Sequence, residues 1–275
     1  MFILYDDEGQ DLEFTNGRFP DGTLNLRIPY KKYIRGVDWY YENDAELFTL
    51  VCIAKSIDHS IDLFLPYIPH ARMDRVKNPE DVFTLKYFCD IINSLNFSTI
   101  YVVDPHSNVS TALLNNVSSI DISSYINDVI ADVKEKYNIN DDQFICFYPD
   151  EGAMKRYSDM VKCPYAFGIK KRDWATGKIE GLDIVNAELV KDKVVLIIDD
   201  ICSRGGTFYH SAKALKNAGA SAVNLYITHA ENTMFEGEMY NEDLVDNIYT
   251  FGYITDITKD IKNKIIRKMV LNDNV

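Results

Sequence analysis

Val194-Val-Leu-Ile-Ile-Asp-Asp-Ile-Cys-Ser-Arg-Gly-Gly-Thr207 is the stretch that decides the fold of this chain. Its uninterrupted apolar run, Val194–Ile198, predicts a parallel strand, because strands covered on both faces carry continuous apolar runs. Two carboxylates and a glycine-rich turn follow this strand directly. In open parallel sheets, ligands bind in the crevice outside the carboxyl ends of the strands. The stretch therefore predicts an α/β fold with a ligand site where this strand ends.

The residues after this strand indicate a site for a sugar phosphate. Gly205 and Gly206 allow positive φ and lack a Cβ, so backbone N–H groups can converge on a phosphate, helped by Thr207 and the next helix N-terminus. Asp199 and Asp200 can accept hydrogen bonds from ribose hydroxyls or help to hold Mg²⁺. A bare Gly-Gly turn is more often a structural connection, but the aspartates before it and the helix after it favour the functional interpretation.

The bulk composition predicts a soluble two-domain protein. The chain has 275 residues, of which 47% are hydrophobic and 26% charged, and it carries a formal net charge of −13. This charge disfavours nucleic acid as a partner, because no overall basic field exists to neutralise phosphates. The first residues lack a basic segment, and no apolar stretch reaches membrane-spanning length. We therefore expect a cytoplasmic protein with no membrane partner.

The five cysteines are an odd number without metal-type spacing, and three lie in apolar runs. We interpret them as reduced core residues. Cys202 lies in the phosphate loop, where neighbouring amides or Arg204 would make it reactive, but a core role is the more common one for such a residue.

A second group of charges follows the apolar run Ile61–Leu65. Arg72 and Arg75 lie three apart with Asp74 between them, a spacing at which two guanidinium groups can hold one polyphosphate. A solvated turn with a surface ion pair is the ordinary alternative, and the spacing alone favours it.

Two further predicted strands also end in carboxylates. Thr99–Val103 is followed by Asp104 and His106, a pair that suits a divalent metal or an oxyanion, although a loop histidine is usually a surface residue. Gln143–Tyr148 is followed by Asp150, which is a candidate metal ligand and is equally well explained as part of a turn.

Lys170–Gly177 is a basic segment in an acidic chain. A cationic loop that closes over a triphosphate would stabilise the charge that develops in transfer and would exclude water. A solvated hairpin is the alternative.

Similar helix-then-strand patterns over 84–106 and 208–229 indicate a weak duplication. We predict two domains, 1–138 and 139–275, the second closed by a helix over Ile257–Val270 that is able to pack back on the first domain.

Taken together, these stretches resemble the ribose-phosphate diphosphokinases, also called PRPP synthetases, over nearly the whole chain. The resemblance rests on seven motifs in the family's order: Phe19-Pro-Asp-Gly22, Pro66-Tyr with Ala71-Arg-Met-Asp-Arg75, Asp104-Pro-His106, Pro149-Asp-Glu-Gly152, Lys170-Lys-Arg172, Asp199-Asp200 with Gly-Gly-Thr207, and Thr228-His229. It implies two similar phosphoribosyltransferase-like α/β domains, each a mainly parallel sheet flanked by helices. It also implies a Mg²⁺-dependent enzyme of nucleotide biosynthesis that transfers the β,γ-diphosphoryl group of ATP to the 1-hydroxyl of ribose 5-phosphate, giving PRPP and AMP.

The resemblance also implies roles for individual residues. Lys170 and Arg172 would stabilise the transition state. ATP would be bound by Phe19, Asp21, Arg72, Asp74, Arg75 and His106. Mg²⁺ would be held by His106, Asp150 and Asp104. The ribose phosphate would be bound by Asp199, Asp200, Ser203, Arg204, Gly205, Gly206 and Thr207.

Departures from the family pattern keep other functions open. Met73 replaces a residue that is usually polar in the family, and Thr23 replaces one that is usually acidic. These two differences leave open how adenine is recognised and whether the family's hexamer forms. We expect a homo-oligomer that is a dimer or is built from dimers. Arg204 adds a cation beside the 5-phosphate and would suit the diphosphate of ADP-ribose, giving ADP-ribose 1-pyrophosphate in NAD metabolism. A non-catalytic regulatory paralogue and a phosphoribosyltransferase are the remaining alternatives.

Overall fold

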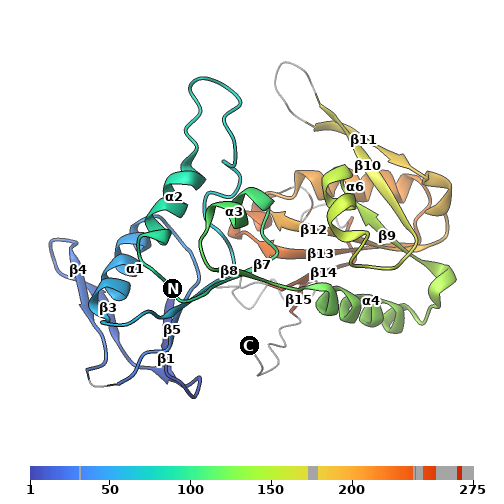
Figure 1. The fold of residues 1–275 in the computed structure, drawn as a ribbon. Coiled ribbons are helices and arrows are strands. Elements are labelled where there is room, and N and C mark those ends of the chain that lie inside the picture. The colour runs from blue at the N-terminus through green and yellow to red at the C-terminus, as the bar shows by residue number, and fades with distance from the viewer. Residues whose placement is uncertain (31, 173–178, 238, 240–243, 252–264, 268–275) are drawn as a thin grey trace. The chain divides into compact units, whose positions relative to one another are not determined.

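The structure is a computed structural model that describes residues 1–275 except 31, 173–178, 238, 240–243, 252–264 and 268–275. The chain forms two compact units, Met1–Asp121 and Ile122–Val275, which are described separately below (Figure 1). Each unit has its own mainly parallel sheet and its own hydrophobic core, so the predicted α/β class is confirmed.

The division falls at Asp121, earlier than the predicted domain boundary at residue 138, because of helix α4 (Ser123–Tyr137). The polar side chains of this helix reach the second unit's sheet. Tyr137 Oη donates to Asn224 Oδ1 at 3.3 Å, and Tyr249 Oη donates to Asp132 Oδ2 at 3.0 Å. The sequence placed α4 by its helical pattern alone, which does not tell which sheet the helix covers.

In the first unit a six-stranded sheet has the order β2-β1-β5-β6-β7-β8. Strands β5 to β8 are parallel, whereas β1 and β2 add an antiparallel edge. A separate hairpin consists of β3 and β4. The elements of this unit are β1 (Phe2–Tyr5), β2 (Asp11–Leu12), β3 (Thr15–Arg18), β4 (Leu24–Arg27), β5 (Gly36–Trp39), α1 (Ala45–Ser56), β6 (Asp62–Leu65), α2 (Thr84–Asn93), β7 (Ile100–Val103), α3 (Asn108–Leu113) and β8 (Val117–Ile120).

The core of the first unit follows the expected periodicities. In α2, Leu85, Phe88 and Ile92 are buried at helical spacing, whereas Val82, just before the helix, and Ile91 are exposed. The helix expected at the start of 84–106 is therefore confirmed as α2, which begins at Thr84.

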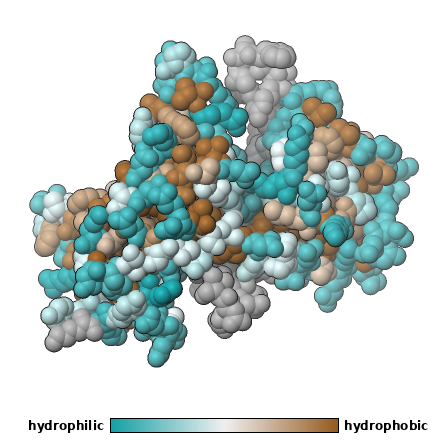
Figure 2. All heavy atoms as spheres, in the orientation of Figure 1, coloured by the Kyte–Doolittle hydropathy of each residue, from teal (hydrophilic) through white to brown (hydrophobic). Residues whose placement is uncertain are grey.

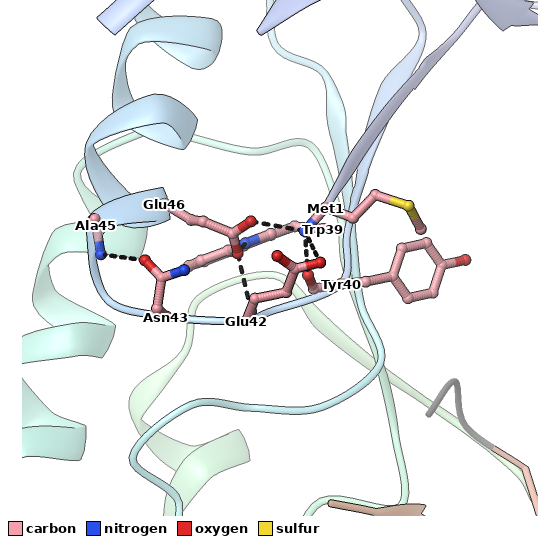
Figure 3. A network of polar contacts seen from close by, with 7 residues as sticks. All are labelled: Met1, Trp39, Tyr40, Glu42, Asn43, Ala45 and Glu46. Carbon is pink, nitrogen blue, oxygen red and sulfur yellow. Dashed lines mark hydrogen bonds and ion pairs between the residues drawn. The ribbon is translucent and has the colours of Figure 1, made fainter. Parts of the chain in front are cut away.

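The start of α1 is fixed by a polar network around Glu46 (Figure 3). Its Oε2 accepts the indole N–H of buried Trp39 and the backbone N–H of Glu42, both at 2.9 Å. Its Oε1 pairs with the terminal amine of Met1 at 2.7 Å. The carboxylate thus joins β1, β5 and the first turn of α1, where a negative charge also suits the helix dipole.

In the second unit a seven-stranded sheet has the order β11-β10-β9-β12-β13-β14-β15. All neighbours are parallel except β10 and β11, which extend as an antiparallel hairpin (Figure 1). Besides α4, its elements are η1 (Asp141–Gln143), β9 (Phe144–Tyr148), α5 (Glu151–Tyr157), β10 (Tyr165–Arg172), β11 (Ile179–Val185), η2 (Ala187–Leu189), β12 (Val194–Cys202), α6 (Gly206–Asn217), β13 (Ala222–Ala230), η3 (Asn232–Glu236), β14 (Asn247–Thr250) and β15 (Ile265–Arg267).

The strand predicted from Val194–Ile198 is confirmed. All five of these residues are buried, and β12 pairs in parallel with β9 and β13. Because parallel strands end at the same edge, the residues after β9, β12 and β13 share one edge of the sheet with the later part of β10.

The predicted helix over Ile257–Val270 is wrong where it can be compared. Ile265–Arg267 form β15, parallel to β14, and most of the remaining residues lie outside the described part of the chain. Two adjacent β-branched isoleucines suit a strand better than a helix.

Hydrophilic side chains cover much of the visible surface, with hydrophobic side chains exposed in patches (Figure 2). The exposed apolar residues include Val76, Val82 and Tyr87 beside and on α2. None of the helices in the described ranges combines the length and the apolar character needed to cross a membrane.

Candidate active site

The end of β12 carries two carboxylates in different surroundings. Asp200 is buried, and its Oδ2 accepts a hydrogen bond from Arg156 Nη1 at 2.9 Å. Asp199 is half-buried, and its Oδ1 accepts the Asp200 backbone N–H at 3.0 Å. Arg156 was not predicted as a site residue, because its position on α5 gives no sign in the sequence that it reaches β12.

The phosphate loop has the backbone that its glycines predict. Gly205 has φ of 71° and precedes α6, whose first residue is Gly206. The Gly205 carbonyl accepts the Tyr209 N–H at 2.8 Å, which closes the first turn of the helix. A Cβ on Gly205 would lie 3.2 Å from the Met239 side chain, whereas a Cβ on Gly206 would meet nothing within 4 Å. Gly205 is thus required by both its conformation and its packing.

A segment after β13 packs against this loop. Ser203 Oγ lies 3.1 Å from Thr233 Oγ1, and Arg204 Nη2 lies 3.5 Å from Glu236 Oε2. A Cβ on Gly237 would overlap the Arg204 carbonyl oxygen, so the two backbones are in close contact. Thr233, Glu236 and Gly237 were not predicted as site residues, because nothing in residues 231–239 resembles a motif.

The ends of β9 and β10 bring Asp150 and Lys170 together. Lys170 Nζ lies 2.7 Å from Asp150 Oδ2, and the Asp150 Oδ1 caps α5 by accepting the Ala153 N–H at 3.0 Å. Gly168 allows this approach, because a Cβ there would lie 2.7 Å from the Pro149 carbonyl oxygen. Burial raises the pKa of Asp150, but the hydrogen bonds from Lys170 and Ala153 outweigh it and lower this pKa below its usual value.

The pKa of Asp199 depends on two neighbouring carboxylates, Asp200 and Asp150. Burial, followed by the negative charges of Asp200 and Asp150, raises the pKa of Asp199 well above its usual value, although Lys170 opposes the shift. The strand ends therefore hold an excess of negative charge that a bound cation would neutralise.

The described residues contain no group of three or more His, Cys, Asp or Glu side chains arranged to hold a metal. Mg²⁺ is usually held by only one or two carboxylates together with substrate phosphates, so the carboxylates at this edge are a donor set that fits Mg²⁺. Asp150 keeps lone pairs for such a role beside its two hydrogen bonds.

Two other predicted features of this unit are the basic segment that begins on β10 and the Thr228-His229 pair on β13. Arg172 ends β10 opposite Ile179, while residues 173–178 of the predicted cationic loop lie outside the described residues. Lys171 pairs with Asp183 of β11 at 2.8 Å, with both side chains exposed. Thr228 and His229 lie buried at the end of β13, with His229 opposite Ile201 of β12.

In the first unit, the predicted ATP-binding residues after β6 and β7 meet at Asp74. Arg75 Nε donates to Asp74 Oδ1 at 2.9 Å. Burial raises the pKa of Asp74. The hydrogen bonds from Arg75 and Ser107 and the nearby His106 outweigh burial, so this pKa is below its usual value. Arg72 is exposed. The pairing of Asp74 with Ser107 was not predicted, although Ser107 directly follows the Asp104-Pro-His106 motif.

Asp104 is buried at the end of β7 and has φ of 42°, a left-handed conformation that non-glycine residues adopt rarely. Such strained positions are common at functional sites. The remaining predicted residues of this unit, Phe19 and Asp21, lie in the β3–β4 turn, where both are exposed and Asp21 Oδ1 accepts the Thr23 N–H at 3.0 Å.

Comparison with known proteins adds the following. A family model of the phosphoribosyl transferase domain matches residues 119–247. A ribose-phosphate pyrophosphokinase of Sulfolobus acidocaldarius is 26% identical over 272 residues, covering 91% of this chain and 89% of that protein. One from Campylobacter jejuni is 28% identical over 269 residues, covering 93% and 82%.

A crystal structure of phosphoribosylpyrophosphate synthetase from Mycobacterium smegmatis superposes with a TM-score of 0.75 at 18% sequence identity, covering 94% of this chain and 86% of that chain. With the family match, this likeness confirms the predicted fold of two phosphoribosyltransferase-like domains.

Proposed function

We propose that this chain is a ribose-phosphate pyrophosphokinase that transfers the β,γ-diphosphoryl group of ATP to the 1-hydroxyl of ribose 5-phosphate and releases AMP. The family and the pyrophosphokinase class were predicted from the sequence and are confirmed by the relatives. The donor, the metal, the leaving group and the acceptor are the parts that this proposal adds.

The observation that carries the proposal is the ion pair between Lys170 and Asp150 at the strand ends that also hold Asp199 and Asp200. Phosphoryl transfer depends on positioning and on fixed charge near the reacting phosphorus rather than on covalent chemistry by the protein. The Lys170 ammonium group supplies a positive charge for the transferred group, and the carboxylates beside it can hold a cation.

On the acceptor side, the phosphate loop would bind the 5-phosphate through the backbone N–H groups of Ser203–Thr207 and the N-terminus of α6. Asp199 and Asp200 would accept hydrogen bonds from the ribose hydroxyls. Because Arg156 pairs with Asp200, that carboxylate is held in place, while the raised pKa of Asp199 makes it a better acceptor for a hydroxyl proton than an ordinary aspartate.

On the donor side, Arg72, Arg75 and His106 would bind the ATP phosphates, with Asp74 orienting Arg75, and Phe19 and Asp21 would contribute to nucleotide binding. At the strand ends of the second unit, Asp150 would help to hold Mg²⁺, which would neutralise the diphosphoryl charge. The 1-hydroxyl attacks the β-phosphorus and AMP leaves, with Lys170 and Arg172 stabilising the developing charge. We further propose that the protein acts as a homo-oligomer.

Two neighbouring lysines on β10 test this function. Lys170→Ala should lower the rate of AMP release from ATP, Mg²⁺ and ribose 5-phosphate by about 10²-fold or more, because it removes a charge aimed at the reacting group. Lys171→Ala is the matched control, because Lys171 is exposed and pairs with Asp183; its rate should stay near that of the parent. An unchanged rate in Lys170→Ala would refute the catalytic assignment.

ADP-ribose is a second candidate acceptor, and the observation that favours it is Arg204. The side chain of this phosphate-loop residue is 75% exposed, so it can reach a second phosphate. If ADP-ribose is the acceptor, Arg204→Ala should lower kcat/KM for ADP-ribose about tenfold more than for ribose 5-phosphate, whereas an equal effect on both would exclude this role.

A further inference from the structure

Two cysteine thiols of the second unit face each other outside the site described above. Cys146 is fully buried in β9, and Cys163 is half-buried in the loop before β10. The Cys146 N–H donates to the Pro164 carbonyl at 3.0 Å, and Cys146 lies opposite Tyr165 in the parallel register. This backbone pairing brings Cys163 against Cys146, and the two thiols are hydrogen-bonded to each other.

The surroundings of the two thiols differ in a way that assigns them different chemistry. The hydrogen bond from Cys146 and the charge of Lys134 lower the pKa of Cys163, while the same hydrogen bond and complete burial raise the pKa of Cys146. Lys134 is held nearby by its ion pair with Asp141 at 2.7 Å and by its position 5.1 Å from the Phe144 ring. The thiolate is the reactive form of cysteine, and a reactive cysteine must also be accessible. Cys163 is the more accessible of the two thiols and the one whose pKa is lowered, so it is the one that we expect to react first.

We propose that Cys146 and Cys163 form a reversible disulfide when a peroxide oxidises Cys163. The Cys163 thiolate attacks a peroxide oxygen: an S–O bond forms, the O–O bond breaks, and the leaving oxygen takes a proton to become water. The Cys146 thiol then attacks the Cys163 sulfur: the S–S bond forms, the S–O bond breaks, and the hydroxide that leaves takes the Cys146 proton. In total, two thiols and one hydrogen peroxide give one disulfide and two waters, and a dithiol reductant reverses the change.

The geometry requires little movement for this step. Because the backbone pairing of Cys146 with Pro164 and Tyr165 places Cys163 beside Cys146, changes in the side chains and in the loop before β10 would bring the two sulfur atoms to bonding distance. The bond would join β9 to the segment entering β10, and these strands lead to Asp150 and Lys170 respectively. Oxidation should therefore stabilise this strand pair against unfolding, because it closes a loop in the unfolded chain. The site depends only on the packing of this unit and not on the proposed function.

The test uses the full chain, treated with an equimolar amount of hydrogen peroxide, alkylated and digested for mass spectrometry. We expect a peptide in which Cys146 and Cys163 are cross-linked, which disappears after dithiothreitol, and a melting temperature several degrees higher before that reduction. Cys163→Ser should remove both effects. Cys52→Ser is the matched control, because Cys52 is another half-buried cysteine, on α1 in the other unit, and it should leave both effects intact.

A second variant keeps the proposal falsifiable if the cross-link is hard to capture. Cys146→Ser, a nearly isosteric change at the buried position, should leave Cys163 as a sulfenic acid that reacts with dimedone. The proposal would be overturned if Cys163 in the parent chain were oxidised past the sulfenic acid without a cross-link. It would equally be overturned if Cys163 reacted with peroxide no faster than Cys52.

Discussion

Asp150 and Asp199 are carboxylates at the strand ends of the second unit, and their surroundings shift their pKa values in opposite directions. Asp150 has a lowered pKa because Lys170 and a backbone N–H outweigh its burial, whereas Asp199 has a raised pKa because burial and two neighbouring carboxylates outweigh Lys170. Lys170 therefore contributes to the ionisation of both. Its removal would leave three acidic groups, at 150, 199 and 200, with Arg156 as the remaining described cation paired to them.

The raised pKa of Asp199 predicts a cost to stability at neutral pH. A group whose pKa is higher in the folded state stabilises the fold fully only below its unfolded pKa, about 3.9, and this contribution is lost as the pH rises through the folded value. Asp199→Asn should therefore raise the melting temperature at pH 7, and this gain should shrink as the pH falls through the folded pKa of Asp199 and vanish below about pH 4.

This effect can be measured by thermal unfolding over a range of pH without ligands, and the same variant should lose affinity for the acceptor. Asp183→Asn, on the exposed partner of Lys171, is a control of equal charge change. A gain that did not depend on pH would contradict the proposed cause.

The phosphate loop is an element whose backbone is fixed from two sides. Its own glycine supplies the left-handed residue before α6, and the segment from Thr233 to Met239 packs against it. Because that segment follows β13, the loop and the strand beside β12 are coupled. A substitution that displaces Met239 or Gly237 should therefore disturb phosphate binding, although neither residue belongs to a motif.

Two adjacent glycines of this element should respond to alanine in opposite directions. Gly205→Ala places a Cβ at φ of 71° and 3.2 Å from Met239, so it should lower the free energy of unfolding by about 1–2 kcal/mol. Gly206→Ala lies at the first residue of α6 with open space around its Cβ, so it should raise that free energy by about 0.4–1 kcal/mol. Urea denaturation of both variants measures the difference, and equal effects would show that the loop is not held as described.

The first turn of helix α1 in the first unit also depends on a single side chain, Glu46. Glu46→Ala should lower the free energy of unfolding by about 1–3 kcal/mol, because it leaves the buried indole N–H of Trp39 and the Glu42 N–H without their acceptor. Glu42→Ala is the control, because its exposed carboxylate makes only a 3.4 Å pair with the terminal amine and its backbone bond is kept. Tryptophan fluorescence during urea unfolding follows both variants, and equal losses would contradict the role of Glu46.

At the scale of the whole molecule, the sequence predicted what depends on local pattern. The run Val194–Ile198 and the glycines after it have few alternatives, so β12, the phosphate loop and α6 could be predicted together. Contacts between distant segments could not. The pairing of Arg156 with Asp200, of Ser107 with Asp74, and of Cys146 with Cys163 each depends on how the strands and helices pack.

Other differences arise where local signals are weak or tertiary contacts decide. The strand Ile265–Arg267 was predicted as part of a Lys-rich helix, because its pairing with the neighbouring strand β14 could not be seen in the sequence. Helix α4 lies in the second unit, and its polar bonds to Asn224 and Tyr249 appear only in the fold and not in the sequence.

Identifying the nucleotide product is the most direct test of whether this protein transfers a diphosphoryl group. We would incubate the protein with Mg²⁺ and ATP, with ribose 5-phosphate or ADP-ribose in separate reactions and neither in a third, and separate the nucleotides by chromatography. We expect AMP in an amount equal to the 1-diphosphorylated acceptor, with ribose 5-phosphate as the preferred acceptor. AMP formed only with ADP-ribose would keep the chemistry and change the acceptor. ADP as the product, or no product that depends on either acceptor, would contradict the account.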